Sequence, residues 1–122
     1  MKTKANRPLV LQPRLRVRRG EDIALGPGKI ALLEELEHTG SITRAAASLG
    51  MSYMRAWTLI RTVNRCFKEP LVVAVRGGSK GGGGAVLTDA GREVLALYQS
   101  MNAKCLKTTQ PEWRRLQKFL RE

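Results

Sequence analysis

The feature that most restricts the fold is a tight turn between two helical patterns in the middle of the chain. The small apolar residues Ala45 to Ala47 follow Ser41, whose side-chain oxygen suits the first position of a helix. Gly50 then suits the left-handed backbone of a turn, and Ser52 can cap a second helix that continues to about Phe67. This layout indicates a helix-turn-helix, although a plain helical hairpin shares the same pattern.

The longer helix of this pair carries an uncompensated positive charge on its outer side. Its apolar residues recur every three or four positions and share the side that we expect to face the core: Ala56, Ile60, Val63 and Phe67. The opposite side presents Met54, Thr58, Arg61 and Arg65. No carboxylate occurs between Glu37 and Glu69, so nothing in this stretch offsets its arginines. The major groove of duplex DNA is wide enough for one such helix.

The charge of the whole chain indicates the same kind of partner. Its 122 residues, about one domain, carry 22 Lys and Arg against 10 Asp and Glu, a net charge of +12. The first acidic residue is Glu21, so we expect residues 1–13 to form a flexible basic arm, followed by a short edge strand over Arg14 to Arg18. Nucleic acid is the first candidate partner, although a basic face that only aids solubility gives the same composition.

A glycine-rich loop is the most unusual segment. Leu71 to Val75 and Ala85 to Leu87 are typical of two strands, and six of the eight residues from 77 to 84 between them are glycine. Such a loop loses much backbone entropy and adds nothing to a core, so we expect a purpose that needs bare backbone. A thin basic tip can follow a phosphate backbone or enter the minor groove, and an inert flexible hairpin is the alternative. No Gly-Lys-Ser or Gly-Lys-Thr follows, which argues against a nucleotide-binding loop.

Three further helical segments surround these elements. Lys29 to His38 is apolar on more than one side, ends at Gly40, and suits a seam between two subunits. Thr88 can cap a long helix, and Pro111 opens a short amphipathic one. The long helix aligns Val94, Tyr98, Met101 and Cys105 as a stripe. We therefore expect a domain over 14–106 and a C-terminal amphipathic helix over 107–122, in a fold that is mainly α with a small β-hairpin wing.

Several classes of function find no support. One histidine, His38, and isolated carboxylates make no catalytic constellation, so we expect neither an enzyme nor a bound cofactor or metal. Cys66 and Cys105 have no partner at metal-ligand spacing and are expected to remain reduced. No apolar stretch is long enough to cross a bilayer, and the basic start lacks the apolar segment of a signal peptide. We therefore expect a cytoplasmic protein that binds no membrane.

A set of motifs resembles those of one group of bacterial regulators. They are Gly40-Ser41-Ile42, Ala45-Ala46, Met51-Ser52-Tyr53, Ala56-Trp57, Asn64, Pro70-Leu71-Val72, the run Gly78 to Thr88, and Gly91. The stretch from Arg14 to Met101 is similar to the DNA-binding domain of ModE-type molybdate-responsive regulators and, more distantly, to the LysR-type domain. The resemblance implies a winged-helix dimer, joined through the first and the long fourth helix, that binds a palindromic operator. Full-length members carry a further oxyanion-binding region, and we expect a stand-alone DNA-binding domain here.

The expected function is that of a sequence-specific DNA-binding transcriptional regulator, a homodimer on double-stranded DNA whose effector is unknown. Residues of the helix pair and the glycine loop are expected to contact DNA: Thr43, Arg44, Ser52, Tyr53, Met54, Arg55, Thr58, Arg61, Arg76, Ser79, Lys80, Gly81 and Gly82. The hydroxyl of Tyr53 can reach a phosphate or bond to its own surroundings, and we expect Trp57 to pack. The alternatives are a nonspecific architectural DNA-binding protein and an oxyanion-responsive regulator.

Overall fold

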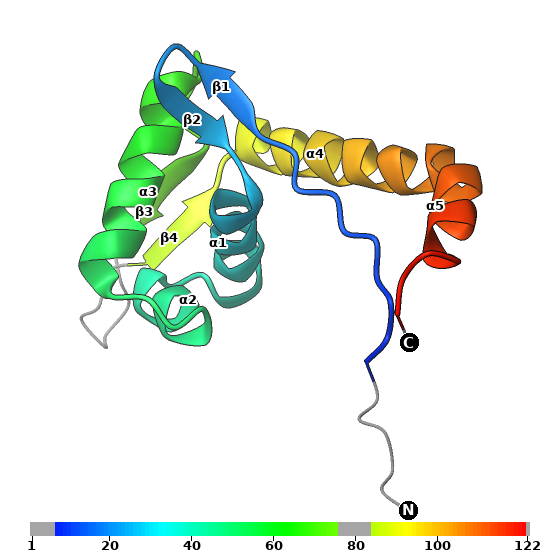
Figure 1. Ribbon diagram of the computed structural model, residues 1–122. Coiled ribbons are helices and arrows are strands. Elements are labelled where there is room, and N and C mark those ends of the chain that lie inside the picture. The colour runs from blue at the N-terminus through cyan, green and yellow to red at the C-terminus, as the bar shows by residue number, and fades with distance from the viewer. Residues whose placement is uncertain (1–6, 76–83, 122) are drawn as a thin grey trace, which may run out of the picture.

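The computed structural model describes residues 7–75 and 84–121. In chain order its elements are β1 (Val17–Arg19), β2 (Asp22–Leu25), α1 (Pro27–Thr39), α2 (Ile42–Ser48), α3 (Tyr53–Cys66), β3 (Val72–Val75), β4 (Gly84–Leu87), α4 (Asp89–Thr108) and α5 (Gln110–Gln117). The fold is a mainly α winged helix with a long C-terminal helix, as the sequence predicts (Figure 1).

Helix α1 lies at the centre of the core. Its four apolar residues, Ile30, Leu32, Leu33 and Leu36, are all buried. The helix contacts α2, α3, α4, β2 and β4, so the apolar residues on its different sides meet neighbours within one chain. Gly40 ends the helix with φ 67°, and its N–H donates to the carbonyl of Leu36 at 2.8 Å. The two-sided apolar pattern is thus explained by packing inside the subunit.

The hairpin of β3 and β4 is the expected wing, and β4 attaches it to the rest of the fold. The two strands are antiparallel, with Val72 opposite Leu87 and Val75 opposite Gly84. Strand β4 also bonds to the corner between α1 and α2, where the N–H of Ala85 donates to the carbonyl of Gly40 at 3.1 Å. A Cβ on Gly84 would lie 2.9 Å from that carbonyl oxygen, so this close approach favours glycine.

A second hairpin, β1 with β2, differs from the expected single strand over residues 14–18. Strand β1 is shorter and shifted, and it pairs with β2 through a turn in which Gly20 has φ 61°. The pairing follows from β2, because Ala24 and Leu25 are buried while Val17 of β1 is 38% exposed. Packing of the second strand on α3 therefore fixes the first.

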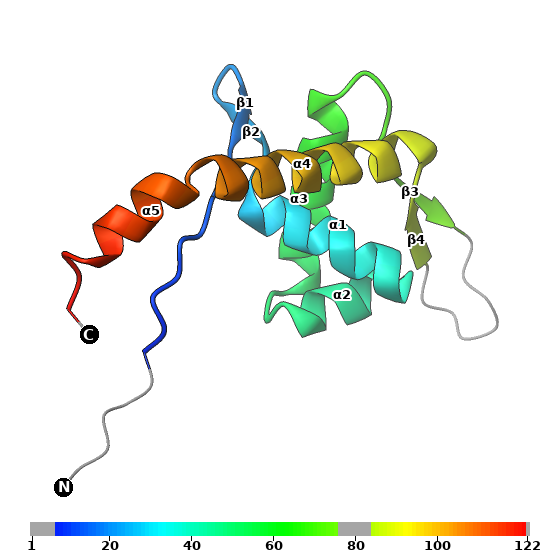
Figure 2. The ribbon, with the colours of Figure 1, turned by 90° about the vertical axis from the view of Figure 1, so that its right-hand side faces the viewer.

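Helix α4 starts against the core and projects beyond it, and α5 follows with no buried residue (Figures 1 and 2). Of the expected stripe, Tyr98 is buried, Val94 and Cys105 are half-buried, and Met101 is 43% exposed. The hydroxyl of Tyr98 donates to the carbonyl of Leu15 at 2.7 Å, which ties the N-terminal segment to α4. Within the described residues no helix could span a membrane.

Candidate nucleic-acid interface

The turn between α2 and α3 has the geometry that the sequence predicts. Ser41 caps α2 by accepting from the N–H of Arg44 at 3.1 Å, and Ser52 caps α3 by accepting from the N–H of Arg55 at 3.0 Å. Gly50 lies between them with φ 66°, in the left-handed region. These local predictions are confirmed, and together they fix the start of α3 at the surface.

The exposed face of α3 brings together three of the predicted contact residues. Met54 is 67% exposed, and Thr58 and Arg61 follow at the four- and three-residue intervals that keep them on one face. The hydroxyl of Thr58 donates to the carbonyl of Met54 at 2.9 Å, so its lone pairs can still accept a bond. Arg65, one turn further on, pairs instead with Asp22 of β2 at 3.3 Å.

Tyr53 and Trp57 are linked on the neighbouring side of α3. The indole Nε1 of Trp57 donates to the hydroxyl oxygen of Tyr53 at 2.7 Å. Trp57 packs against the core cluster, as expected, while Tyr53 stays 45% exposed. Because the Tyr53 oxygen accepts this bond, its own proton remains free to donate to an acceptor such as a phosphate oxygen.

The remaining predicted residues fall into two groups. Thr43 and Arg44 are exposed in the first turn of α2. Arg76, Ser79, Lys80, Gly81 and Gly82 lie outside the described residues.

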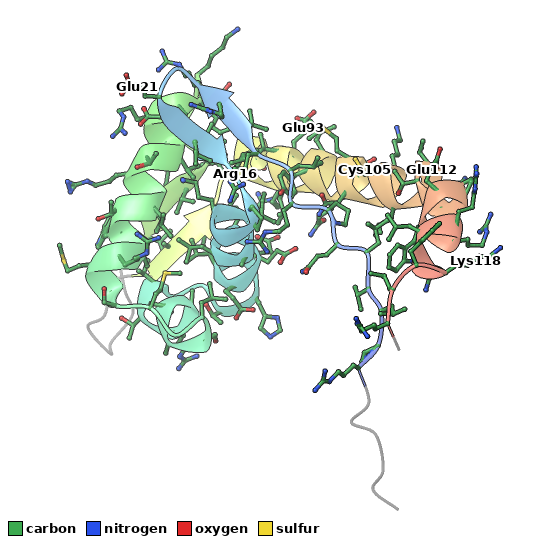
Figure 3. The ribbon with its side chains drawn as sticks, in the orientation of Figure 1. Arg16, Glu21, Glu93, Cys105, Glu112 and Lys118 are labelled. Atoms are coloured by element: carbon green, nitrogen blue, oxygen red, sulfur yellow. The ribbon has the colours of Figure 1, made fainter. Side chains whose placement is uncertain are left out.

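Arg55 lines a groove that the sequence analysis did not predict. The groove measures 240 Å³ and lies between the N-terminal segment, the start of α1 and α3, with Arg14, Arg16 and Lys29 around it (Figure 3 labels Arg16). Lys29 had no assigned role, and the only signals were alternating arginines before β1 and a lysine in the first turn of a helix.

The pKa of Lys29 is lowered in this groove. Burial is the largest cause that lowers it below 10.5; nearby Cys66 acts against that shift, Arg55 adds to it, and Asp22 opposes it. The groove therefore places a partly desolvated ammonium beside other cations.

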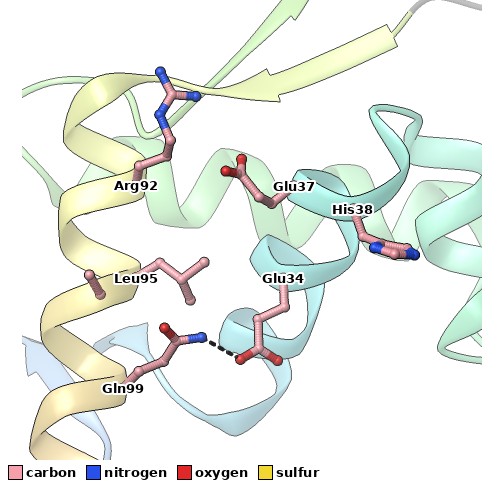
Figure 4. A pocket seen from close by; sticks show the side chains of 7 residues that line it. Glu34, Glu37, His38, Arg92, Leu95 and Gln99 are labelled. Carbon is pink, nitrogen blue, oxygen red and sulfur yellow. Dashed lines mark hydrogen bonds between the residues drawn. The ribbon is translucent and has the colours of Figure 1, made fainter.

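A second groove, between α1 and α4, has a different character (Figure 4). It measures 480 Å³ and is lined by Glu34, Glu37, His38, Arg92 and Gln99, among others. Gln99 donates to a carboxylate oxygen of Glu34 at 2.9 Å. Two carboxylates on its wall make this groove unfavourable for an anion.

These features define a winged helix-turn-helix protein of the DNA-binding class: a capped helix pair, an outward basic helix and an attached hairpin. The family model described as "Bacterial regulatory helix-turn-helix protein, lysR family" matches residues 28–92. The chain belongs to this family.

Relatives identify the ModE-type branch that the sequence motifs resemble. The chain is 49% identical over 78 residues to the "Molybdenum transport protein ModE" of Azotobacter vinelandii, covering 64% of this chain and 28% of that protein. It is 47% identical over 72 residues to the "Transcriptional regulator ModE" of Yersinia pestis, covering 59% of this chain and 27% of the relative. With the "DNA-binding transcriptional dual regulator ModE" of Escherichia coli (strain K12) the identity is 43% over 72 residues, with the same coverage of 59% and 27%. The chain thus spans less than a third of the length of these relatives.

Proposed function

We propose that this protein is a sequence-specific transcriptional regulator that binds a palindromic DNA operator as a homodimer. The observation that supports it most is the exposed face of α3, where Met54, Thr58 and Arg61 share one side of a helix whose start is capped and open. Because the proposed partner is duplex DNA, we infer that the protein acts in the cytoplasm, and that it acts by binding rather than by catalysis.

Base reading belongs to α3 in this proposal. Arg61 donates two hydrogen bonds to a guanine edge or to a phosphate, and Met54 makes apolar contact with a thymine methyl group. Thr43, Arg44, Ser52 and Tyr53 hold the phosphate backbone beside the groove. The glycine loop, with Arg76, Ser79, Lys80, Gly81 and Gly82, follows the flanking minor groove.

Dimerisation is proposed to bury the apolar residues that α4 exposes. Leu97 is 57% exposed and Met101 43%, one turn apart on the face of α4 that does not pack on the core. Leu116 of α5 is also 50% exposed. In a two-fold dimer joined through α4, the two copies of α3 would enter two successive major grooves on the same side of the duplex.

Selection of duplexes from a random pool, followed by fluorescence anisotropy, tests the proposal. We expect a palindromic site whose affinity falls with salt by roughly 0.9 log units per log unit for each neutralised phosphate. Arg61→Ala should cost about 1 to 3 kcal/mol of binding free energy on that site if the side chain reads a base. Arg115→Ala on α5, an equal change of charge at an exposed position, is the control.

Two other functions give different results in the same assays. Equal affinity for every duplex at moderate salt would support the architectural DNA-binding protein instead. The names of several relatives refer to molybdenum, so calorimetry with molybdate, tungstate and sulfate tests the oxyanion-responsive regulator. Heat of binding from one of these anions alone would favour that function.

A further inference from the structure

The groove beside α3 gathers positive charge from three separate parts of the chain. Arg14 and Arg16 come from the N-terminal segment, Lys29 from the first turn of α1, and Arg55 from α3. We call these four side chains the cationic groove. Its other lining residues are apolar or glycine, and no carboxylate is among them: Ile23, Gly26, Pro27, Gly28, Met51 and Leu59.

The carboxylate that acts on Lys29 is already paired with another residue. Asp22 lies close enough to influence Lys29, but its side chain pairs with Arg65 at 3.3 Å. The start of α1 adds to the positive field, because its N-cap residue is Gly26 and no side chain caps it. Arg16 lies directly over this helix start, since a Cβ on Gly26 would touch its Cγ at 3.6 Å. The groove is thus complementary to an anion with several oxygen atoms.

The cationic groove and the wing lie on opposite sides of α3. Asn64 bonds to β3, whereas Arg55 lines the groove, and their separation of nine positions is two and a half helical turns. Figure 2 agrees with this arrangement, since the β1–β2 hairpin lies to the left of α3 and strands β3 and β4 lie to its right. A helix in the major groove has one phosphate backbone along each of its two edges.

We infer that the cationic groove holds a backbone phosphate of the bound duplex, on the strand across the major groove from the wing. This inference rests on the proposed DNA binding and adds a contact outside the helix pair and the wing. The four cations bind the phosphate oxygens and contact no bases, so they determine the position of α3 on the duplex rather than its sequence preference.

Lys29→Gln tests the inference, with Lys118→Gln as the matched control. Lys118 is an exposed lysine at the end of α5, far from Arg16 (Figure 3). We expect Lys29→Gln to lower the salt slope of duplex binding by about 0.9 log units per log unit, which is about eightfold in Kd at 0.1 M salt, for each groove occupied. The loss should be equal on selected and unselected duplexes, and Lys118→Gln should bind as the wild type does. Arg16→Gln, checked like the others by circular dichroism, repeats the test at a second residue.

Neutral methylphosphonate linkages, introduced one at a time, identify the phosphate. At one linkage in each half-site, neutralisation should weaken the wild type but not Lys29→Gln, because the contact is already lost there. An unchanged salt slope for both groove variants, or a loss that couples to no linkage, would overturn the inference while leaving DNA binding intact. Saturation by inorganic phosphate alone at submillimolar concentration would assign the groove to a free oxyanion and overturn it as well. If the wild type binds no duplex, the proposed function and the inference fail together.

Discussion

At the scale of single residues, Lys29 is a positive charge whose partial burial is unfavourable for folding. Burial is the main cause that lowers its pKa below 10.5, and the positive charge of Arg55 acts in the same direction. Cys66 and Asp22 act against the shift without cancelling it. Residues that bind a ligand often destabilise the free protein, which is a common trade-off between stability and function.

Lys29→Met should therefore stabilise the free protein at pH 7. Because folding lowers the pKa of Lys29, the unfavourable effect is present below that lowered value and disappears as the pH rises toward 10.5. The gain in free energy of unfolding should be roughly 0.5 kcal/mol, since solvent screens much of the interaction. Urea denaturation at pH 7 and at pH 10 measures it, with Lys68→Met as the control. A variant less stable than the wild type at pH 7 would contradict the argument.

At the scale of elements, two hairpins fix α3. On one side Asn64 donates to the carbonyl of Val72 at 2.9 Å and accepts from the N–H groups of Leu71 and Val72 at 2.8 and 3.2 Å. On the other side Arg65 pairs with Asp22 of β2. A helix held from both flanks can turn little about its own axis, so its outer face is set before DNA arrives.

Asn64→Leu should separate the wing from α3. It leaves the N–H groups of Leu71 and Val72 and the carbonyl of Val72 without their Asn64 partner, which should cost about 2 to 3 kcal/mol of unfolding free energy. DNA affinity should fall too, because the wing is no longer held. Asn102→Leu is the matched control, since the Oδ1 of Asn102 is buried with no partner among the described residues and its removal should be neutral or stabilising. Equal thermal melts for the two variants would show that Asn64 does not hold the wing.

The sequence predicts the short-range features of these elements well. Gly40, Gly50, Ser41, Ser52 and Thr88 were all assigned correctly, because a cap or a turn depends on three or four neighbouring residues. The face of α3 followed in the same way from its periodicity.

Features that depend on distant contacts were missed. Strand β1 has three residues and exists because β2 packs on α3, which no local pattern reveals. The cationic groove needed residues 14, 16, 29 and 55 to meet, and spacing along the chain does not show this. The buried line of α4 passes through Leu95 rather than Met101, since one helical stripe can be drawn in more than one way before its neighbours are known.

At the scale of the whole molecule, large apolar side chains are exposed on α4 and after α5. Leu97 and Met101 of α4 and Phe119 after α5 are 57%, 43% and 89% exposed. The four large apolar side chains of α1, by contrast, are all buried. A second copy of the chain that covers α4 would remove this surface from water.

The double substitution Leu97→Glu with Met101→Glu should convert the proposed dimer to a monomer. Charge repulsion and loss of apolar burial both act against the seam, and affinity for a palindromic duplex should fall by at least tenfold because the two half-sites are then bound separately. Light scattering after gel filtration gives the mass. Ala103→Glu is the control, because Ala103 is exposed on the same helix but lies two residues from Met101 and therefore on a different face. An unchanged dimer would place the seam elsewhere.

A single residue, Thr88, separates the wing from α4. Its hydroxyl donates to the carbonyl of Pro70 at 2.8 Å, its N–H donates to Leu71 at 2.9 Å, and its oxygen accepts from Gly91 at 3.0 Å. A Cβ on Gly91 would collide with the Leu71 carbonyl, so the backbone of α4 packs closely against the start of the wing. Strands β3 and β4 are therefore rigidly joined to α4. In the proposed dimer, the angle at which two copies of α4 cross would also set the orientation of both β3–β4 pairs, and with it the operator spacing that the dimer could span.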